Sequence, residues 1–184
     1  MKMDISKSAL ILIDLQNGVT AVELNPHKAI QIIENANHLI NKFREENGFI
    51  VFVRTAFIDN KDILPADKKL RSLSDVKESF DQIDNRLSIR QNDYLVTKRG
   101  FSAFFGTDLD LELRRHGIEN LVFAGVSTHI GIDTSAKDGY QLNYNIYFIE
   151  DAISAPKEKQ HEFIVKEIFP LYGEVIKTED LILN

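Results

Sequence analysis

Short apolar runs alternate along this chain with longer segments in which apolar residues recur every three or four positions. Residues 9–13 (ALILI) and 49–53 (FIVFV) are continuous apolar runs, which predict strands buried on both faces of a parallel sheet. Between them, residues from about 27 to 47 carry the apolar stripe of an amphipathic helix. Gly48 follows at the position where a helix end favours a left-handed residue. The pattern thus begins as strand, helix, strand.

The same alternation continues further along the chain. Four more strands are predicted at residues 94–97, 121–124, 146–149 and 174–177, and helices at 107–117, 132–142 and 156–169. Thr107 and Asp110 have the spacing of a capping box at one helix start. Repeated strand–helix–strand order predicts an α/β fold with a doubly wound, six-stranded parallel sheet and helices on both faces.

Residues 56–92 do not follow this alternation. The segment is charged and weakly periodic. A connection of this length is typical of a lid, a binding loop or an interface. Arginines within it and just before it are either contacts for a substrate carboxylate or solvated surface groups: Arg54, Arg71, Arg86 and Arg90.

Composition narrows the class of protein. A chain of 184 residues without an internal repeat fits a single domain over residues 1–184. Its net charge of −6 is opposite to the basic surface of nucleic-acid binding proteins. No stretch approaches the roughly 20 apolar residues of a membrane span, and the first strand begins too early for a signal peptide. We therefore expect a cytoplasmic protein that acts on a small molecule, without nucleic acid or membrane.

Polar residues follow several predicted strands, at the edge where open α/β sheets bind ligands. Asp14 follows the first strand, Lys98 the third, and the turn at residues 125–131 the fourth. A buried carboxylate is unfavourable unless paired. Asp14 is therefore either a functional, proton-transferring group or a structural one that caps a helix or accepts a hydrogen bond in a loop. Gln16 either orients a ligand or is a turn residue.

Other candidates at this edge have structural alternatives as well. Phe101 and Phe104, after Lys98, either line a pocket or belong to the core. Gly131 lies near a helix start, where N–H groups favour an anion, or it simply fits a tight turn. His129 is either an acid–base group or a polar residue at the helix start. None of the five histidines shows the spacing of a metal pair, so neither metal nor cofactor is expected.

Four stretches of the chain resemble the isochorismatase-like, or cysteine hydrolase, superfamily. They are ALILIDLQN at 9–17, VTKRGFSAFFGTDLDLELRRHGIENLVFAG at 96–125, VSTHIGIDTSAKDGYQLNY at 126–144 and EDAIS at 150–154. The resemblance implies a three-layer α/β sandwich around a six-stranded parallel sheet. It also implies hydrolysis of small molecules and assembly as a homodimer or homotetramer.

Most members of that family use an Asp-Lys-Cys triad, and the resemblance assigns its first two residues to Asp14 and Lys98. The cysteine position falls on Gly131, and the chain has no cysteine at all, so covalent thiol catalysis is impossible. Isochorismatases also lack the cysteine and often have glycine there. The Asp/His/His metal set of the nicotinamidases is absent as well, because Arg-Thr-Ala-Phe stands at residues 54–57.

The resemblance also places the substrate site and predicts its backbone. It implies a cis peptide bond between Val126 and Ser127. Around Asp14, Lys98 and Gly131 we expect substrate contacts from Gln16, Phe101, Phe104, Val126, Ser127, His129 and Ile130.

Isochorismatases split the vinyl ether of isochorismate into pyruvate and a dihydroxy-cyclohexadiene acid, a reaction that needs no thiol. On this interpretation Asp14 protonates the vinyl carbon, water adds to the oxocarbenium ion, and Gly131 leaves room for the enolpyruvyl group. Burial favours the neutral acid, whereas nearby Lys98 favours the carboxylate. Alternatively, Lys98 binds a carboxylate of the substrate.

Two other functions stay open from the sequence. The chain is either a non-catalytic descendant that still binds a small molecule, or an amidase whose cysteine has been replaced by Gly131. Retention of both Asp14 and Lys98 favours an enzyme over a binding protein, because a dead site has no need of a buried charged pair.

Overall fold

A six-stranded, all-parallel sheet forms the centre of the computed structural model, which describes residues 2–58, 62–63 and 79–183. The strands are β2 (Ser8–Ile13), β3 (Phe49–Thr55), β4 (Tyr94–Lys98), β5 (Asn120–Val126), β6 (Asn145–Ser154) and β7 (Glu174–Ile176). They lie in the order β4-β3-β2-β5-β6-β7, and all neighbours are parallel. The predicted doubly wound sheet is therefore confirmed.

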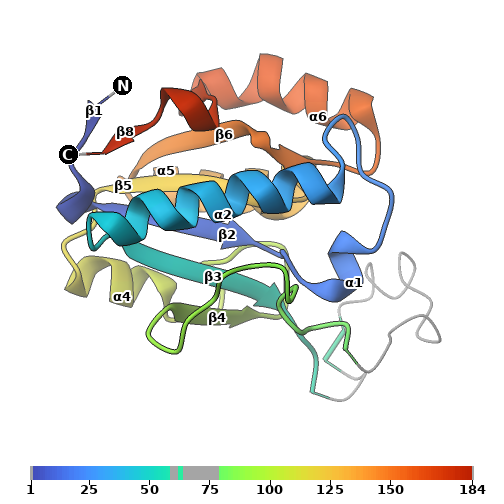
Figure 1. Cartoon of the computed structure of the whole chain (residues 1–184), viewed down its shortest axis with the longest axis horizontal. Coiled ribbons are helices and arrows are strands. Elements are labelled where there is room, and N and C mark those ends of the chain that lie inside the picture. Colours follow the sequence, from blue (N-terminus) through green and yellow to red (C-terminus); the bar gives the residue numbers. More distant parts are fainter. Residues whose placement is uncertain (1, 59–61, 64–78, 184) are drawn as a thin grey trace.

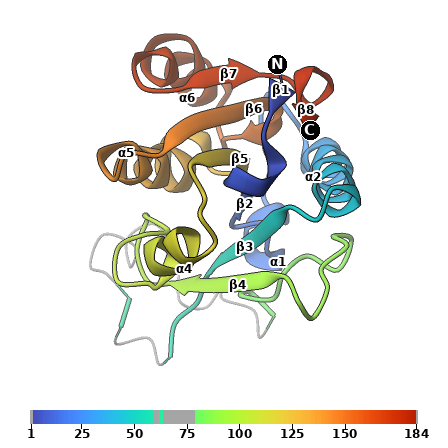
Figure 2. The same ribbon diagram turned by 90° about the vertical axis from the view of Figure 1, so that its left-hand side faces the viewer.

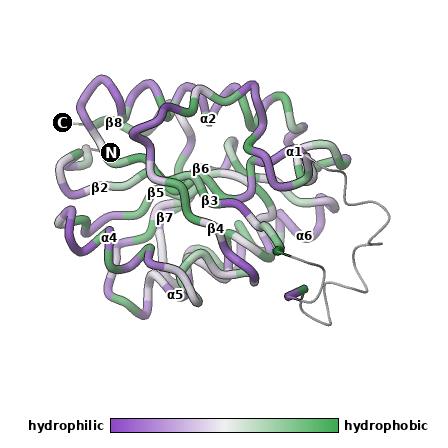
Figure 3. Tube along the Cα trace, turned by 90° about the horizontal axis from the view of Figure 1, so that it is seen from below, coloured by the Kyte–Doolittle hydropathy of each residue, from purple (hydrophilic) through white to green (hydrophobic). Residues whose placement is uncertain are grey.

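Helices cover both faces of this sheet. Figure 2 shows α2 (Ala29–Glu45) on one side of the strands and α4 (Leu109–Arg115) and α5 (Asp133–Gln141) on the other. Side chains along a strand alternate between faces, so Leu10 and Leu12 of β2 join the core beneath α2, whereas Ile11 joins the core beneath α5. In Figure 3 hydrophobic colour accordingly follows the central strands. Within the described residues, no helix is long and apolar enough to cross a membrane.

The two ends of the described chain meet in a second, smaller sheet that the sequence does not predict. There β1 (Lys2–Met3) pairs in parallel with β8 (Ile182–Leu183), and both lie at the opposite end of the molecule from α1 (Asn17–Thr20) in Figure 1. Short 3-10 turns adjoin these strands: η1 (Ile5–Lys7) and η6 (Thr178–Asp180). The ammonium of Lys42 in α2 donates to the carbonyls of Thr178 and Leu181 at 3.0 Å each, which fixes the C-terminal segment to the helix.

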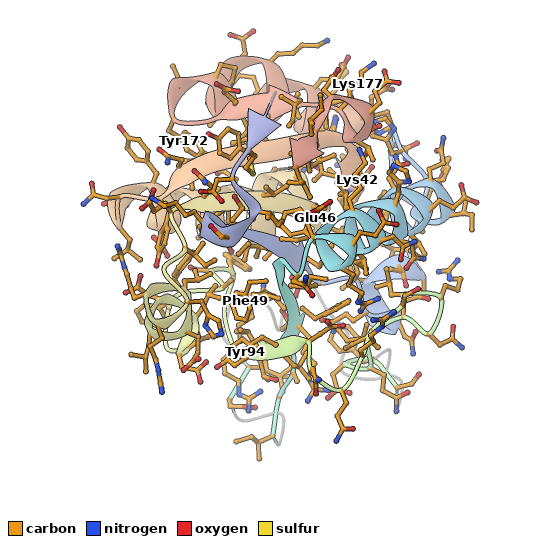
Figure 4. All side chains as sticks on the ribbon, turned by 60° about the vertical axis from the view of Figure 1, so that its left-hand side comes forward. Lys42, Glu46, Phe49, Tyr94, Tyr172 and Lys177 are labelled. Atoms are coloured by element: carbon orange, nitrogen blue, oxygen red, sulfur yellow. The ribbon has the colours of Figure 1, made fainter. Side chains whose placement is uncertain are left out.

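The amino-terminal strands and the helix between them differ from the prediction only at the helix ends. α2 starts at Ala29, and its left-handed residue is Asn47 (φ 58°) rather than Gly48. Gly48 is required for a different reason, since a Cβ there would stand 2.5 Å from Ile5 Cδ1. The aromatic rings of Phe49 and Tyr94, labelled in Figure 4, lie 6.0 Å apart on neighbouring strands β3 and β4.

Two predicted helices contain turns of other types. The helix predicted at 156–169 consists of α6 (Glu158–Phe163), a π-helical turn η4 (Ile164–Ile168) and a 3-10 turn η5 (Phe169–Leu171). A second π-helical turn, η3 (Thr128–Ile132), leads into α5. The capping box predicted at residues 107 and 110 is wrong, because the hydroxyl of Thr107 instead accepts from the N–H of Leu109 at 3.3 Å.

The irregular segment at 56–92 contains neither a helix nor a strand in its described part, beyond a single bridge between Ile83 and Gln16. One anchor of this segment is Asp84. Its carboxylate accepts from the hydroxyl of Thr20 at 2.6 Å and from two nitrogens of the Arg86 guanidinium at 2.8 and 2.6 Å. These contacts tie the segment to α1, beside the carboxyl ends of the strands.

Candidate active site

Four neighbouring strands bring polar groups to one edge of the sheet. Asp14 follows β2, Thr55 ends β3, Lys98 ends β4, and the turn after Val126 follows β5. The winding direction of the chain reverses between β2 and β5. Open α/β sheets bind ligands at such switch points, outside the carboxyl ends of the strands. The structure therefore places the predicted candidates Asp14 and Lys98 where sheets of this type bind their ligands.

Asp14 and Lys98 form a buried ion pair at this edge. Lys98 Nζ lies 2.9 Å from Asp14 Oδ2, and the two side chains are 2% and 11% exposed, respectively. The hydroxyl of Thr55 donates to Asp14 Oδ1 at 3.1 Å. The backbone of Asp14 is left-handed, with φ 50°, and its N–H donates to the carbonyl of Val53 at 2.8 Å. The carboxylate is thus fixed by contacts on both oxygens.

The ammonium of Lys98 is fully engaged by the protein. Besides Asp14, it donates to the carbonyls of Gly100 at 3.2 Å and Phe101 at 2.9 Å. An ammonium has three donors, so none is left for a substrate carboxylate. This geometry argues against the alternative in which Lys98 binds the substrate, and for one in which it holds Asp14.

Gln16 lies beneath the site rather than on its surface. Its side chain has no exposed area. The amide NH₂ donates to the carbonyls of Thr55 at 2.9 Å and Phe80 at 3.0 Å, and the amide oxygen accepts from the N–H of Thr55 at 2.7 Å. Gln16 therefore positions Thr55, which in turn contacts Asp14. Thr55 is not among the residues predicted from the sequence, although it stands two positions after the apolar run at 49–53, near the carboxyl end of a predicted strand.

The turn after β5 comes very close to β2. Gly125 has φ +121°, and a Cβ there would stand 2.1 Å from the carbonyl oxygen of Ile13, so no side chain fits between the strands. The peptide bond between Val126 and Ser127 is cis, as the resemblance implies. The chain then enters η3, which carries Gly131 back towards Asp14.

Gly131 adjoins the carboxylate directly. A Cβ at this position would lie 3.3 Å from Asp14 Oδ2 and 2.9 Å from Ile13 Cγ2. The carbonyl of Gly131 accepts from the hydroxyl of Ser135 at 2.6 Å, which fixes the turn to α5. A cysteine at this position would therefore contact Asp14, whereas glycine places no side chain against that oxygen of the carboxylate.

The remaining residues of η3 and of the turn before it differ in how far they are exposed to solvent. His129 is half-buried, and its Nδ1 lies 3.1 Å from the hydroxyl of Ser127. Burial lowers the pKa of His129 despite the nearby charge of Asp133, which leaves a neutral imidazole at pH 7. Ile130 is partly exposed, whereas Val126 is 2% exposed and belongs to the core beneath α2.

The two phenylalanines predicted to line a pocket lie in different environments. Phe101 is 38% exposed, and its carbonyl accepts from Lys98. Phe104 packs against the core beneath α5, with its ring 6.1 Å from that of Tyr144. Phe104 therefore has the surroundings of a core residue, which is the structural alternative left open by the sequence.

Two of the arginines considered for substrate binding, Arg54 and Arg86, have side-chain partners within the protein. Arg86 is bound to Asp84, and Arg54 donates to the hydroxyl of Thr97 at 3.1 Å and to the carbonyl of Asp81 at 3.3 Å. The backbone N–H of Arg90 donates to Asp93 at 2.7 Å. Arg71 lies outside the described residues.

Among the described residues, one group has ligand atoms close enough to hold a metal ion: His27, Glu150 and His161. Asp14, Thr55 and Lys98 do not belong to it. Spacing rules along the chain do not reveal this group, because its histidines come from distant segments and meet only in the fold.

Comparisons with known proteins place the chain in a family. A family model described as "Isochorismatase domain" matches residues 8–180. The uncharacterized isochorismatase family protein YwoC of Bacillus subtilis (strain 168) is 38% identical over 99% of this chain and 96% of its own length. Ureidoacrylate amidohydrolase RutB of Acinetobacter baylyi is 28% identical over 97% of this chain and 72% of its own length. The structure of an isochorismatase family protein from Burkholderia thailandensis has a TM-score of 0.83 and 33% identity, covering 96% of this chain and 94% of that one.

Proposed function

Because the chain belongs to the isochorismatase family of hydrolases, we propose that it hydrolyses a small carboxylated molecule without a thiol, using Asp14 to transfer the proton. The observation that carries this proposal is the place of Gly131. The position of its absent Cβ is 3.3 Å from Asp14 Oδ2. An atom of water or substrate at about that position is within reach of the carboxyl group.

The reaction class that best fits this arrangement is hydrolysis of a vinyl ether. Asp14 in its acid form gives a proton to the vinyl carbon, and water adds to the resulting oxocarbenium ion. Asp14, now a carboxylate, takes the proton released by that water, and the hemiketal collapses to a ketone and an alcohol. Lys98 and Thr55 stabilise the carboxylate formed in the first step, since both contact it. General acid catalysis of this kind contributes roughly 10²–10⁴-fold.

A second candidate is hydrolysis of an amide or ureido group by water. Lys98 and Thr55 both contact the Asp14 side chain, and a carboxylate held in this way can act as a base that activates water. The likeness to an enzyme named ureidoacrylate amidohydrolase favours this substrate class. In this case Asp14 accepts the proton of water first and returns it to the leaving nitrogen.

Product release distinguishes these reactions. We would measure pyruvate from isochorismate, loss of ureidoacrylate, and ammonia from nicotinamide, each with the native chain and with Asp14→Asn. Pyruvate release that disappears in Asp14→Asn supports the vinyl-ether reaction, and loss of ureidoacrylate supports the second candidate. Glu119→Gln, an exposed carboxylate before β5, serves as the control and should keep full activity.

Undiminished turnover by Asp14→Asn would rule out the assignment of Asp14. Should no substrate react, while a carboxylated ligand still raises the melting temperature, the chain is a non-catalytic binding protein.

A further inference from the structure

The group formed by His27, Glu150 and His161 lies apart from the Asp14–Lys98 pair and takes no part in the proposed hydrolysis. His27 precedes α2, Glu150 belongs to β6, and His161 belongs to α6; Figure 1 shows the loop before α2 beside α6. Their ligand atoms all lie within 4.8 Å of one another. We propose that this group binds a divalent transition-metal ion of the Zn²⁺ type.

The spacing of the ligand atoms supports the proposal. Nitrogen and oxygen ligands lie about 2.0–2.2 Å from Zn²⁺ in a tetrahedral site, which puts them roughly 3.3 Å from each other. Glu150 Oε1 lies 3.1 Å from His27 Nε2 and 3.6 Å from His161 Nε2. Both separations are close to the edge of that tetrahedron, and the two histidine nitrogens lie within 4.8 Å of each other, so a metal ion fits once the two imidazoles adjust around it.

The chemistry of the three groups selects the type of metal. Two imidazoles and one carboxylate suit Zn²⁺ and its transition-metal neighbours, whereas Mg²⁺ and Ca²⁺ prefer sites built from oxygen ligands. Three protein ligands also leave a fourth position that water or another small ligand can occupy.

His161 is held in an orientation that suits a ligand. It is 2% exposed, and its Nδ1 lies 3.0 Å from the hydroxyl of Thr128, which is completely buried. When that hydroxyl accepts from Nδ1–H, the lone pair of Nε2 faces Glu150. Metal-bound histidines are commonly oriented in this way, by a hydrogen bond from the other ring nitrogen. The ring of His27 packs edge-on against that of His161, with centroids 5.6 Å apart.

Thr128 also gives the site a connection to the turn after β5. It is the first residue of η3, the π-helical turn that carries Gly131. A metal ion at this site would therefore join the loop before α2, β6 and α6, and it would contact η3 through the hydrogen bond between His161 and Thr128.

The test is a zinc titration of the full chain after treatment with a chelator, using a chromophoric competitor to report free zinc. We expect one equivalent to bind to the native chain and to raise its melting temperature. Glu150→Gln replaces one ligand with an uncharged side chain of the same shape, and His27→Asn removes the imidazole of a second. They should weaken binding by at least about 100-fold, since changes outside the ligand set already weaken metal binding 10–100-fold. His38→Asn, an exposed histidine on α2, should bind as the native chain does.

The coordination geometry provides a second measurement that does not depend on hydrolysis. Co²⁺ in place of Zn²⁺ should give the intense visible absorption of a tetrahedral site, and that absorption should be absent from Glu150→Gln. If the native chain binds no zinc, or if binding persists in both ligand variants, the three residues are only an ion-pair cluster and the proposal is wrong. Either result leaves the hydrolysis assay of the native chain and Asp14→Asn unaffected.

Discussion

At the scale of single residues, the ammonium of Lys98 binds Asp14 and backbone carbonyls after β4 rather than solvent. Its side chain is 2% exposed and all three of its donors are engaged. Replacing one partner of a buried ion pair leaves the other charge uncompensated, which costs about 3–5 kcal/mol.

We therefore expect Lys98→Met to lower the free energy of unfolding by about 3 kcal/mol or more. Adding Asp14→Asn should recover part of that loss, since it removes the unpaired carboxylate. Urea denaturation of the two single variants and the double variant measures this coupling. Strictly additive losses would show that the two side chains do not depend on each other.

A second residue-scale prediction concerns Gly131. Gly131→Ala puts a methyl group 3.3 Å from Asp14 Oδ2 and 2.9 Å from Ile13 Cγ2. The variant should fold with a measurable loss of stability, because the Ile13 methyl group is completely buried on the central strand β2 and cannot move away without a shift of the backbone. Its turnover should fall at least about tenfold, because displacement of the reacting atoms raises the activation free energy by about 1 kcal/mol or more. Steady-state kinetics beside a melting curve checks both parts, and unchanged turnover would contradict the proposed place of the substrate.

The sequence predicts that Asp14 and Lys98 lie at one edge of the sheet, because each stands at the carboxyl end of a predicted strand, and the structure pairs them at 2.9 Å. It does not predict which atoms are the hydrogen-bond partners of each side chain. Gln16 illustrates the limit: it lies at the same edge, yet its side chain bonds to backbone atoms of Thr55 and Phe80. Such partners are separated by dozens of residues and are defined only by the fold.

At the scale of elements, the strands are predicted well and the helix boundaries less well. Four of the six strands, β2, β3, β5 and β6, contain a run of at least four apolar residues, which has few alternative structures in an α/β chain. The π-helical turns at 128–132 and 164–168 and the cis bond at Asn25–Pro26 leave no trace in hydrophobic periodicity. The pair β1 and β8 contributes two residues per strand, too few for any periodic signal.

The irregular segment offers an element-scale prediction, because Asp84 anchors it. The Arg86 guanidinium donates to both carboxylate oxygens and, with the Thr20 hydroxyl, lowers the pKa of Asp84 to about 2 against the opposing effect of burial. The folded chain therefore binds fewer protons than the unfolded chain between about pH 2 and pH 4. The contribution of Asp84 to stability is complete above that window and is lost as the pH falls through it.

Asp84→Asn should thus lower the free energy of unfolding at pH 7 by about 1–2 kcal/mol, a figure reduced for the solvent around the half-exposed Arg86. The variant should also lose less stability than the native chain on going from pH 5 to pH 2. Denaturation at a series of pH values measures the difference. Parallel curves for the two proteins would show that the carboxylate does not anchor the segment.

At the scale of the whole molecule, we expect the chain to assemble as a homodimer or homotetramer. Its described surface carries large apolar side chains where α5 approaches the end of the α6–η5 segment. Tyr140 is 53% exposed with its ring 5.9 Å from that of Tyr172, and the neighbouring Leu171 is 75% exposed. Exposed apolar groups that lie together are typical of interfaces.

Leu171→Glu should therefore shift the chain towards the monomer in sedimentation velocity. Leu111→Glu is the matched control, since Leu111 is a 56% exposed leucine on α4, and it should leave the native assembly intact. A native chain that sediments as a monomer would contradict the expectation, as would dissociation by the control alone.

The absence of a side chain at residue 131 has a consequence for substitution at this position. Codons for glycine and cysteine can differ by a single base, and a side chain at residue 131 would contact Asp14 and require Ile13 to move. A single base change therefore suffices to place a thiol beside Asp14, so that thiol-dependent hydrolysis and the thiol-independent hydrolysis that we propose are one substitution apart. A library that varies only the codon for residue 131, placed under selection for growth on amides, would sample both chemistries without any change to Asp14 or Lys98.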